Sequence, residues 1–426
     1  MTKKTHNLTH LNRRGFLKAG AASAAAVGLY SPAFAAGRTI KIGMVMPQTG
    51  PLAFFSEHVD FVLGQVQKAT GGKLDIDGRQ IPFEILLRDS QSNPNRASEV
   101  AAELILDEGV DLMIAAATPE TTVPVSDMCE LNGVPCVTND TPLEPYFQAR
   151  GGDPDVGFEW TNHFFFSGTQ SAGTNLNMFG QIASDKMVGA LWPNDGDGNA
   201  FAQSYPALFD SLGYGLSDPG RFDMPLSSYA AAVSQFKADG VDLIYGVIPP
   251  PEFTTFWNEA AQQQFQPKLV YAGKTVQFPA AIEPFGARAE GLITEVWWAP
   301  SYPYASTMTG QSSQELADEY EAASGRQWSM PLAYRHSLFE VIFDGLKRVQ
   351  DLDDPESIQA AFNETDMVSV VGPINFQTGP LPNTCMTPTA GGQWVKGDKY
   401  PLSLVICDNE FAPEVPVQGE VQPLTY

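Results

Sequence analysis

Apolar runs alternate with helix-like stretches along most of the chain after residue 38. The first run, Thr39 to Met46, has the composition of a strand and is broken by the turn sequence Pro47-Gln-Thr-Gly-Pro51. The pattern that follows predicts a helix at 56–69, a strand at 81–88, a helix at 95–107, a strand at 110–116, a helix at 122–131 and a strand at 134–138. Strands that alternate with helices of this length indicate βαβ units on a parallel sheet.

The same alternation restarts after an aromatic stretch at 158–166. It predicts a helix at 172–184, a strand at 187–192, helices at 200–212 and 230–238, and strands at 241–247 and 268–271. One phrase occurs in both halves, as Glu108-Gly-Val-Asp-Leu-Met-Ile114 and as Asp239-Gly-Val-Asp-Leu-Ile-Tyr245. We interpret the two copies as equivalent strands of two similar lobes. A helical section at 314–349 and a hairpin-like tail at 372–406 return the chain to the lobes.

The expected fold class is α/β, with two similar Rossmann-like lobes, a hinge and a central cleft. We assign residues 38–162 plus about 303–366 to the first lobe, and about 168–297 plus about 373–426, with a C-terminal hairpin, to the second. The chain then crosses the hinge near 163–167, 296–303 and 366–373. Ligands of open α/β sheets bind at the carboxyl ends of the parallel strands, so the loops there should line the cleft.

The first 35 residues have the features of an export signal. Asn12-Arg-Arg-Gly-Phe-Leu-Lys18 is followed by an Ala/Gly-rich stretch and by the cleavage pattern Ala33-Phe-Ala35. The apolar stretch is too short and too weakly apolar to span a bilayer. We expect a twin-arginine signal peptide over 1–35 and a mature protein in the periplasm, with an uncleaved tether as the alternative.

The chain is strongly acidic. Its formal net charge is −24, and cleavage of the signal removes five basic residues and no acidic one, which leaves 20 basic residues against 49 acidic ones. This excess argues against nucleic acid and anionic lipid as partners. No second apolar segment approaches membrane length, and we expect a soluble monomer.

Four cysteines in an oxidising compartment predict disulfides. They are Cys129, Cys136, Cys385 and Cys407, and they allow three connectivities. We favour Cys129 with Cys136 across a helix-to-strand turn, and Cys385 with Cys407 across a C-terminal hairpin. Because the sequence has no CxxC and no Cys/His cluster, we expect structural links and no metal site.

Several of these features together resemble one known family. They are the export signal, the first strand with its continuation Ile40-Lys-Ile-Gly-Met-Val-Met-Pro-Gln-Thr-Gly-Pro-Leu-Ala53, the duplicated lobes and Gly133-Val-Pro135. In this order they are similar to the periplasmic solute-binding proteins of ABC transporters, in the Leu/Ile/Val receptor family. The resemblance implies a type I binding-protein fold that closes on a small solute and delivers it to a permease in the inner membrane. It implies no catalytic residue and no cofactor.

The resemblance also implies ligand-binding positions. In the family an aromatic residue after the first strand packs on the ligand, and Phe55 falls at that place. Hydroxyls and backbone N–H groups at the next cleft strands hold the ligand carboxylate, and the matching positions are Thr118, Thr121, Asn139 and Thr141. Donors at a helix N-terminus suit an anion because the helix dipole points the same way. Glu120 departs from the small hydroxyl residue of the family.

The second lobe departs further from the family. Two aromatic positions and the acidic position that pairs with the ligand ammonium fall on Asp197, Pro249 and Lys274, respectively. A buried cation at 274 would repel an ammonium and attract an anion, unless Lys274 is a solvated surface residue. We therefore expect an anionic carboxylate, aromatic or apolar in its body, in place of an ordinary amino acid. A branched-chain amino acid and an amide- or urea-like solute are the alternatives.

Many aromatic residues lie near the expected cleft and hinges, and most of them should pack in the core. They are Phe54, Phe55, Phe158, Trp160, Phe164, Phe165, Phe166, Trp192, Phe201, Trp297, Trp298, Tyr302 and Tyr304.

Signals for other chemistry are weak. Asp195-Gly-Asp-Gly-Asn199 resembles the start of a calcium loop, but Ala200 and Pro206 replace the glycine and the acid that such a loop needs. Ser234-Gln-Phe-Lys237 matches S-x-x-K within an expected helix, without the other motifs of that enzyme class. An exported cofactor-dependent enzyme is the alternative from another class, although no G-x-G-x-x-G supports it.

Overall fold

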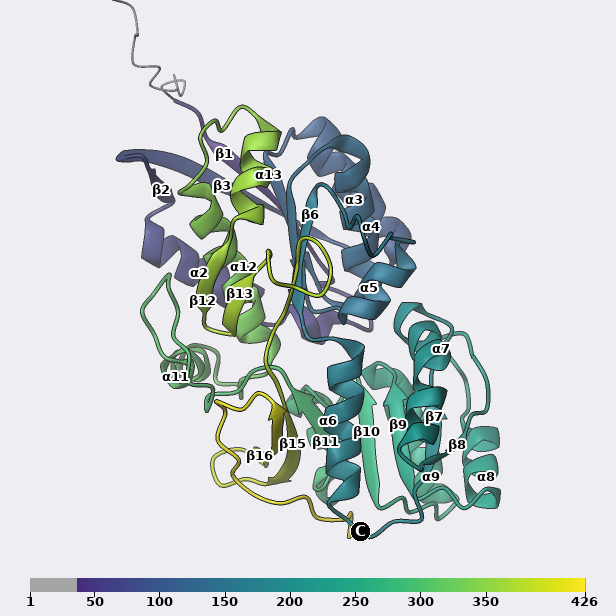
Figure 1. The fold of residues 1–426 in the computed structure, drawn as a ribbon. Helices are drawn as coiled ribbons and strands as arrows, with labels where there is room; N and C mark the ends of the chain where they lie inside the picture. Colours follow the sequence, from purple (N-terminus) through teal and green to yellow (C-terminus); the bar gives the residue numbers. More distant parts are fainter. Residues whose placement is uncertain (1–36, 426) are drawn as a thin grey trace, which may run out of the picture. The chain divides into compact units, whose positions relative to one another are not determined.

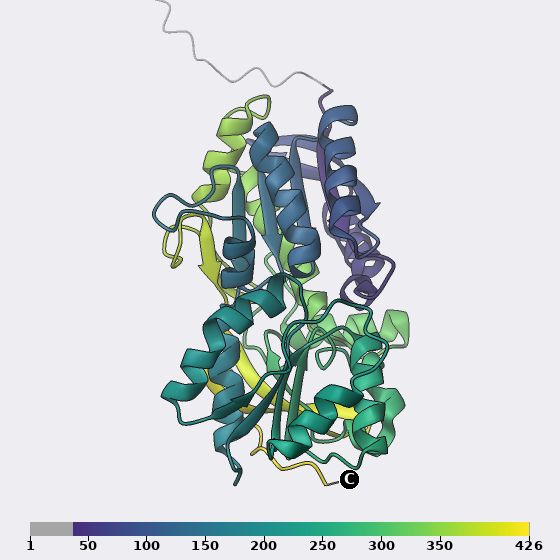
Figure 2. The ribbon, with the colours of Figure 1, turned by 90° about the vertical axis from the view of Figure 1, so that its right-hand side faces the viewer.

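Two seven-stranded sheets organise the described part of the chain, residues 37–425 of a computed structural model. The predicted signal peptide lies outside these residues. From Arg38 onward the chain forms one unit, in which the two sheets lie one beyond the other (Figures 1 and 2). No helix within residues 37–425 is both long enough and apolar enough to cross a membrane.

The first sheet has the strand order β14-β6-β5-β4-β1-β3-β2. Its strands are β1 (Ile40–Met46), β2 (Lys73–Ile76), β3 (Arg79–Asp89), β4 (Leu112–Ala116), β5 (Cys136–Asn139), β6 (Thr161–Phe165) and β14 (Thr384–Met386). All neighbours run parallel except β2 and β3. Helices cover both faces (Figure 1). One face carries α2 (Val59–Thr70), α12 (Pro331–Leu346) and α13 (Pro355–Asn363), and the other carries α3 (Pro94–Ala102), α4 (Thr118–Asn132) and α5 (Leu143–Ala149).

The second sheet has the order β16-β15-β11-β10-β9-β7-β8. Its strands are β7 (Met187–Leu191), β8 (Gly215–Ser217), β9 (Leu243–Val247), β10 (Leu269–Gly273), β11 (Ile293–Val296), β15 (Thr389–Lys396) and β16 (Leu402–Phe411). The helices between these strands are α6 (Gly168–Gly180), α7 (Gly196–Ser211), α8 (Ala230–Ala238), α9 (Pro250–Gln262) and the short α10 (Pro279–Ile282). Only β15 and β16 run antiparallel to their neighbours.

The remaining elements are short segments and one further helix. They are the 3₁₀ segments η1 (Ala53–Ser56) and η3 (Glu283–Ala289, kinked at Gly286), the π-helical η2 (Glu103–Asp107) that continues α3, the helix α11 (Ser313–Ser324), and a ribbon of β12 (Asp366–Ser369) and β13 (Gly372–Asn375). The predicted helical section at 314–349 is therefore two helices, α11 and α12.

The two sheets repeat one arrangement of strands. The order β3-β1-β4-β5-β6-β14 corresponds to β8-β7-β9-β10-β11-β15, which places the two copies of the repeated phrase at β4 and β9. In each copy the aspartate accepts a hydrogen bond from a backbone N–H at the neighbouring strand, Asp111 from Lys41 at 2.8 Å and Asp242 from Asp185 at 2.7 Å. The predicted α/β fold with two similar lobes is confirmed.

Three helices begin four residues earlier than their apolar pattern predicts: α4 at Thr118, α6 at Gly168 and α7 at Gly196. Their first turns contain Gly, Pro, Thr and Ser, which have low helix propensity and no apolar periodicity. Side chains compensate at two of these ends, because Ser167 and Gln170 form a capping box and Asp195 accepts from the N–H of Gly198 at 2.8 Å. The helix N-termini consequently extend to the cleft.

The chain passes between the sheets in short segments. It leaves the first sheet after β6 and enters α6 within three residues, and it leaves the second sheet after β11. The last passage differs from the predicted range 366–373. Since β14 pairs with β6 in the first sheet, the chain returns to the second sheet only between Met386 and Thr389.

The cysteines are free in the described structure, and the predicted disulfides are wrong. Cys385 lies on β14 in the first sheet, whereas Cys407 lies on β16 in the second, so the expected hairpin between them does not exist. Cys129 and Cys136 are buried together in the core of the first sheet. Burial, followed by the thiol of Cys136, raises the pKa of Cys129, which favours the protonated thiol.

Four free thiols give a direct chemical prediction. Protein unfolded in urea without reductant should take up four alkyl groups by mass spectrometry, because no cysteine is bridged. A reductant should leave the thermal midpoint unchanged. Incorporation of two groups, with a midpoint that falls on reduction, would show that one pair is oxidised.

Candidate ligand-binding cleft

A narrow cavity lies between the carboxyl ends of the strands of the two sheets. Its volume is about 410 Å³. It therefore suits a small solute in this arrangement of the lobes. The lining residues are Phe55, Thr118, Asp140, Pro142, Phe165, Phe166, Ser171, Asp197, Phe201, Val247, Tyr271, Gly273, Lys274, Gln277, Glu295 and Trp297.

Strained backbone turns side chains into this cavity. Thr118, Asp140 and Lys274 have φ values of 62°, 60° and 69° and lie within two residues of the ends of β4, β5 and β10. Left-handed backbone is uncommon for residues other than glycine and costs of order 1 kcal/mol or more. Such strain concentrates at ligand sites, where the surrounding structure enforces it.

Lys274 is held by carboxylates from both lobes. Its Nζ lies 2.8 Å from Asp195 and 2.9 Å from Asp197, both at the start of α7, and 3.4 Å from Glu120 on α4. The Lys274 side chain is 5% exposed, so the interpretation as a solvated surface residue is wrong. The two acids at the start of α7 therefore pair with a lysine. Among residues 37–425, no group of His, Cys, Asp and Glu side chains is arranged to hold a metal ion.

The cluster contains more acid than one lysine can neutralise. Burial lowers the pKa of Lys274, but the three carboxylates outweigh it and raise the pKa well above the usual value. Burial raises the pKa of Asp197 to about 7, against the attraction of Lys274 and with the repulsion of Asp195 and Glu120. The positive charge that predicted an anionic ligand is therefore already compensated.

A buried pair positions the loop after β5. Arg335 on α12 forms an ion pair with Asp140 and donates to Asn139 Oδ1 at 3.1 Å and to the carbonyl of Phe55 at 3.2 Å. The side chains of Arg335 and Asp140 are both fully buried. One guanidinium thus fixes two segments of the cleft wall. Burial raises the pKa of Asp140 to about 6, although Arg335 opposes the shift.

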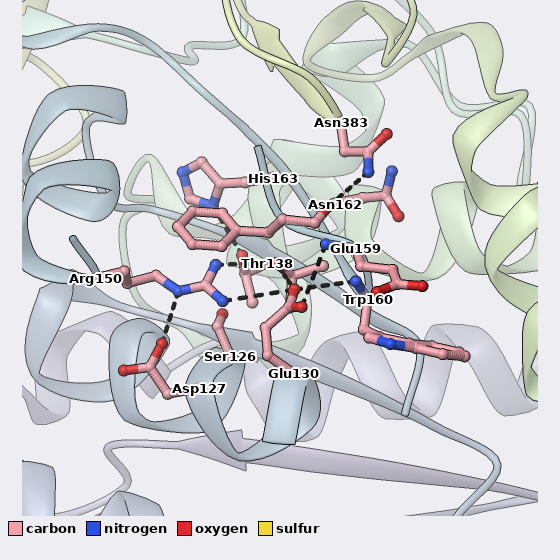
Figure 3. A network of polar contacts seen from close by, with 12 residues as sticks. Ser126, Asp127, Glu130, Thr138, Arg150, Glu159, Trp160, Asn162, His163 and Asn383 are labelled. Carbon is pink, nitrogen blue, oxygen red and sulfur yellow. Dashed lines mark hydrogen bonds and ion pairs between the residues drawn. The ribbon is translucent and has the colours of Figure 1, made fainter. Parts of the chain in front are cut away.

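Behind that loop lies a second polar network, centred on Arg150 (Figure 3). Arg150 donates to Asp127 at 2.8 Å, and Glu130 accepts from the backbone N–H of Trp160 at 3.0 Å. These contacts join α4, α5 and the segment entering β6. The ring of His163 lies 2.8 Å from both the Thr138 hydroxyl and the Thr141 carbonyl, so it connects β6 to the cleft loop. Burial lowers the pKa of His163 to about 3, which keeps it neutral.

Of the predicted binding residues, four line the cavity: Phe55, Thr118, Asp197 and Lys274. The other four are buried behind it. Thr121 contacts the Ser90 hydroxyl at 3.2 Å, Thr141 contacts the Thr122 hydroxyl at 2.8 Å, Asn139 donates to the Tyr334 carbonyl at 2.9 Å, and Pro249 is the N-cap residue of α9. The three polar residues among them hold neighbouring segments together through these hydrogen bonds.

Tyr271 on β10 and Glu295 on β11 face the cavity and were not singled out from the sequence, whereas Gln277 lies in the loop 273–277 that was expected to line the cleft. A single acid inside a buried strand was the available signal for Glu295. Among the aromatic residues near the expected cleft, Phe55, Phe165, Phe166, Phe201 and Trp297 line the cavity. Trp192, Trp298 and Tyr302 are buried outside its lining.

Two α/β lobes with a solute-sized cavity between them define a two-lobed binding protein. The sequence matches the periplasmic binding protein family over residues 39–398, so the chain belongs to that family. It also matches the twin-arginine translocation signal over residues 10–30, which confirms export by that route to the periplasm.

A sequence relative is consistent with the family assignment, and solved structures share the fold. The Leu/Ile/Val-binding protein homolog 3 of Brucella melitensis is 28% identical over 54% of this chain and 59% of its own length, so the match spans less than two thirds of that relative. The leucine-binding protein LivK of Thermotoga maritima has a TM-score of 0.70 at 20% identity, over 86% of this chain and 97% of its own. A solute-binding protein of Rhodopseudomonas palustris was solved with 3,4-dihydroxybenzoic acid. It has a TM-score of 0.68 at 17% identity, over 90% of this chain and 98% of its own.

The buried acids predict a fall in stability with rising pH. Burial raises the pKa of Glu295 to about 7 in the folded state, above its ordinary value of 4.5. A carboxyl with a raised folded pKa stabilises the fold below its unfolded pKa, and this stability is lost as pH rises through 7. We expect the free energy of unfolding of the wild type, measured in urea, to fall between pH 5 and 8, and this group should account for up to about 3 kcal/mol of the fall. Glu295→Gln should reduce that slope, and an unchanged slope would contradict the assignment.

Breaking the Arg335–Asp140 pair should be costly. Arg335→Met leaves the Asp140 carboxylate buried without its cation, which typically destabilises a fold by about 3–5 kcal/mol. The double variant Arg335→Met, Asp140→Asn should recover part of the loss, because the uncompensated charge is gone. Urea unfolding of the three proteins measures both effects, and a loss below about 1 kcal/mol in the single variant would contradict this role.

Proposed function

We propose that this protein is a receptor that captures a small solute in the cavity between its lobes and delivers it to an ABC permease in the inner membrane. Membership of the periplasmic binding protein family supports the receptor role. Ligand-dependent closure gives such a receptor its signal, because a ligand that contacts both lobes stabilises the closed form. We propose no catalytic role for the lining residues.

Contacts between the lobes support a closed arrangement around the cavity. The ring of Phe55 on the first lobe lies 4.8 Å from that of Phe278 on the second, and Lys274 reaches Glu120 at 3.4 Å. Glu144 on α5 accepts from the backbone N–H groups of Gly168 and Thr169 at the start of α6. A solute would enter when these contacts separate and would be enclosed when they re-form.

The polar character of the cavity favours a ligand that donates hydrogen bonds. Acceptor oxygens of Asp140, Asp197, Gln277 and Glu295 have no hydrogen-bond partner within the described residues. An anion would add negative charge to a site where Lys274 is outnumbered by acids. Because of this excess of free acceptors, we propose that the ligand has N–H donors. We also propose that it has an apolar part that contacts the aromatic residues.

An aromatic carboxylate, as predicted from the sequence, is the second candidate. The Rhodopseudomonas palustris neighbour was solved with 3,4-dihydroxybenzoic acid, and aromatic rings line the present cavity. Binding of a carboxylate here would require the buried acids to take up protons, since their negative charge would otherwise repel it.

A ligand screen with a blocked cavity tests the receptor function. Mature protein is heated with amino acids, carboxylates, amides, ureas and amidines, and a ligand at about 100 times its Kd should stabilise the fold by roughly 2.7 kcal/mol. Ser171 lines the cavity, so Ser171→Phe should abolish the shift by filling the space. Ser211→Phe adds the same ring at an exposed position on α7 and should keep the shift. Absence of any shift, or equal shifts in both variants, would refute the proposal.

A further inference from the structure

One pair of side chains presents two free acceptors to the cavity. Glu295 Oε2 and Gln277 Oε1 have no hydrogen-bond partner among residues 37–425, although these residues are only 2% and 4% exposed. Gln277 Nε2 donates to Glu295 Oε1 at 2.8 Å. This bond fixes the amide orientation, because the reversed amide would set its oxygen against the carboxylate. The pair therefore offers two oxygens, Gln277 Oε1 and Glu295 Oε2, and the nearby Tyr271 hydroxyl is a local donor to this carboxylate.

Asp197 extends this acceptor surface. Its Oδ2 contacts Lys274 at 2.9 Å, while its Oδ1 has no hydrogen-bond partner in the described part of the chain and the residue is 3% exposed. Asp197 is close enough to Glu295 to contribute to raising its pKa, after the larger effect of burial. The free donors at the same cavity are Trp297 Nε1 and the Thr118 hydroxyl, so they are fewer than the free acceptor oxygens of Asp140, Asp197, Gln277 and Glu295.

Charged groups line this surface or contact residues that line it, on every packed element. They are Glu120 on α4, Asp195 and Asp197 on α7, Lys274 after β10, Glu295 on β11, and Asp140 with Arg335 between β5 and α12. Tyr271 adds a hydroxyl, which favours the ionised form of Glu295. The two cations are engaged by these acids, so the unmatched charge is negative.

We propose that the ligand is an amidinium or guanidinium cation, whose N–H groups are accepted by Glu295, Gln277 and Asp197. This inference rests on the proposed receptor function and names the ligand class of the same cavity. A planar cation with several N–H groups on one carbon matches oxygen acceptors on adjacent side chains, and it is less strongly hydrated than an ammonium. Its flat face also suits the rings of Phe201, Tyr271 and Trp297. The ammonium group of Lys274 already occupies the position between Glu120, Asp195 and Asp197.

Cation binding is then linked to proton release. Burial raises the pKa values of Asp197 and Glu295 to about 7, so both carboxyls can hold a proton near neutral pH. A bound cation favours the ionised forms and expels those protons. A neutral amide displaces fewer protons, and a carboxylate ligand takes protons up. The sign of the proton exchange thus reports the charge of the ligand at this surface.

Isosteric probes separate charge from shape. We would titrate the mature protein calorimetrically with benzamidine, benzamide and benzoate, and with acetamidine, acetamide and acetate, at pH 7 in phosphate and in Tris. In at least one size series, we expect the amidine to bind most tightly, the amide less tightly and the carboxylate least. The Kd values of the amidine and the carboxylate should differ by about tenfold or more. The two buffers should report net proton release on amidine binding, because a bound cation shifts both carboxyls toward their ionised forms.

Two matched variants locate the effect. Glu295→Gln keeps the side-chain shape and should weaken amidine binding at least about tenfold and reduce the proton release. Glu252→Gln removes another buried carboxyl from the same lobe, outside the cavity, where it holds the Tyr229 hydroxyl at 2.6 Å, and it should leave binding unchanged. Thermal midpoints of both variants check the fold.

Some outcomes would overturn the ligand class while leaving the receptor function in place. Carboxylates that bind as well as amidines, proton uptake on binding, or a cavity-dependent hit from another chemical class with no amidine binding in either size series would each do so. Equal losses in Glu295→Gln and Glu252→Gln would also overturn it. The receptor proposal fails separately, when no solute in the screen binds or when Ser171→Phe does not block binding.

Discussion

The electrostatic balance around Lys274 is the constraint on which the cleft depends. Its ammonium is almost removed from water, and three carboxylates from two helices replace that water. Because Asp195 and Asp197 also begin α7 and Glu120 lies in the first turn of α4, the cluster brings together helix ends from opposite lobes. Three acids surround one lysine, so negative charge is left over at the cleft, and our proposal for the ligand rests on this excess.

The walls of the cleft are supported from behind by polar contacts of another kind. Arg335 connects the end of β5 to the segment of Phe55, and His163 connects the same loop to β6. These groups do not line the cavity, yet they hold the backbone at Asp140 in a conformation that an isolated chain would avoid. The shape of the cavity therefore depends on residues that lie outside its lining.

The alternation of apolar strands and helices was sufficient to predict the two lobes, because periodicity is a local property of the chain. The positions of Phe55, Thr118, Asp197 and Lys274 at the cleft followed from family resemblance. The family resemblance did not predict that carboxylates compensate the charge of Lys274. Its acidic partners come from segments about 80 and 150 residues away in sequence, and a local pattern does not show such neighbours. Cys385 shows the same limit, because its strand partner, β6, lies in the first half of the chain.

The final passage between the sheets also limits how the lobes can move. β14 is hydrogen-bonded into one sheet and β15 into the other, with only Thr387 and Pro388 between them. Thr387 is itself tied to the first lobe through the Phe165 carbonyl and the Tyr334 hydroxyl. The proline ring restricts one of the few remaining torsions. This junction can thus act as a pivot of nearly fixed position, which favours rotation of one lobe about it and disfavours sliding or wide translation.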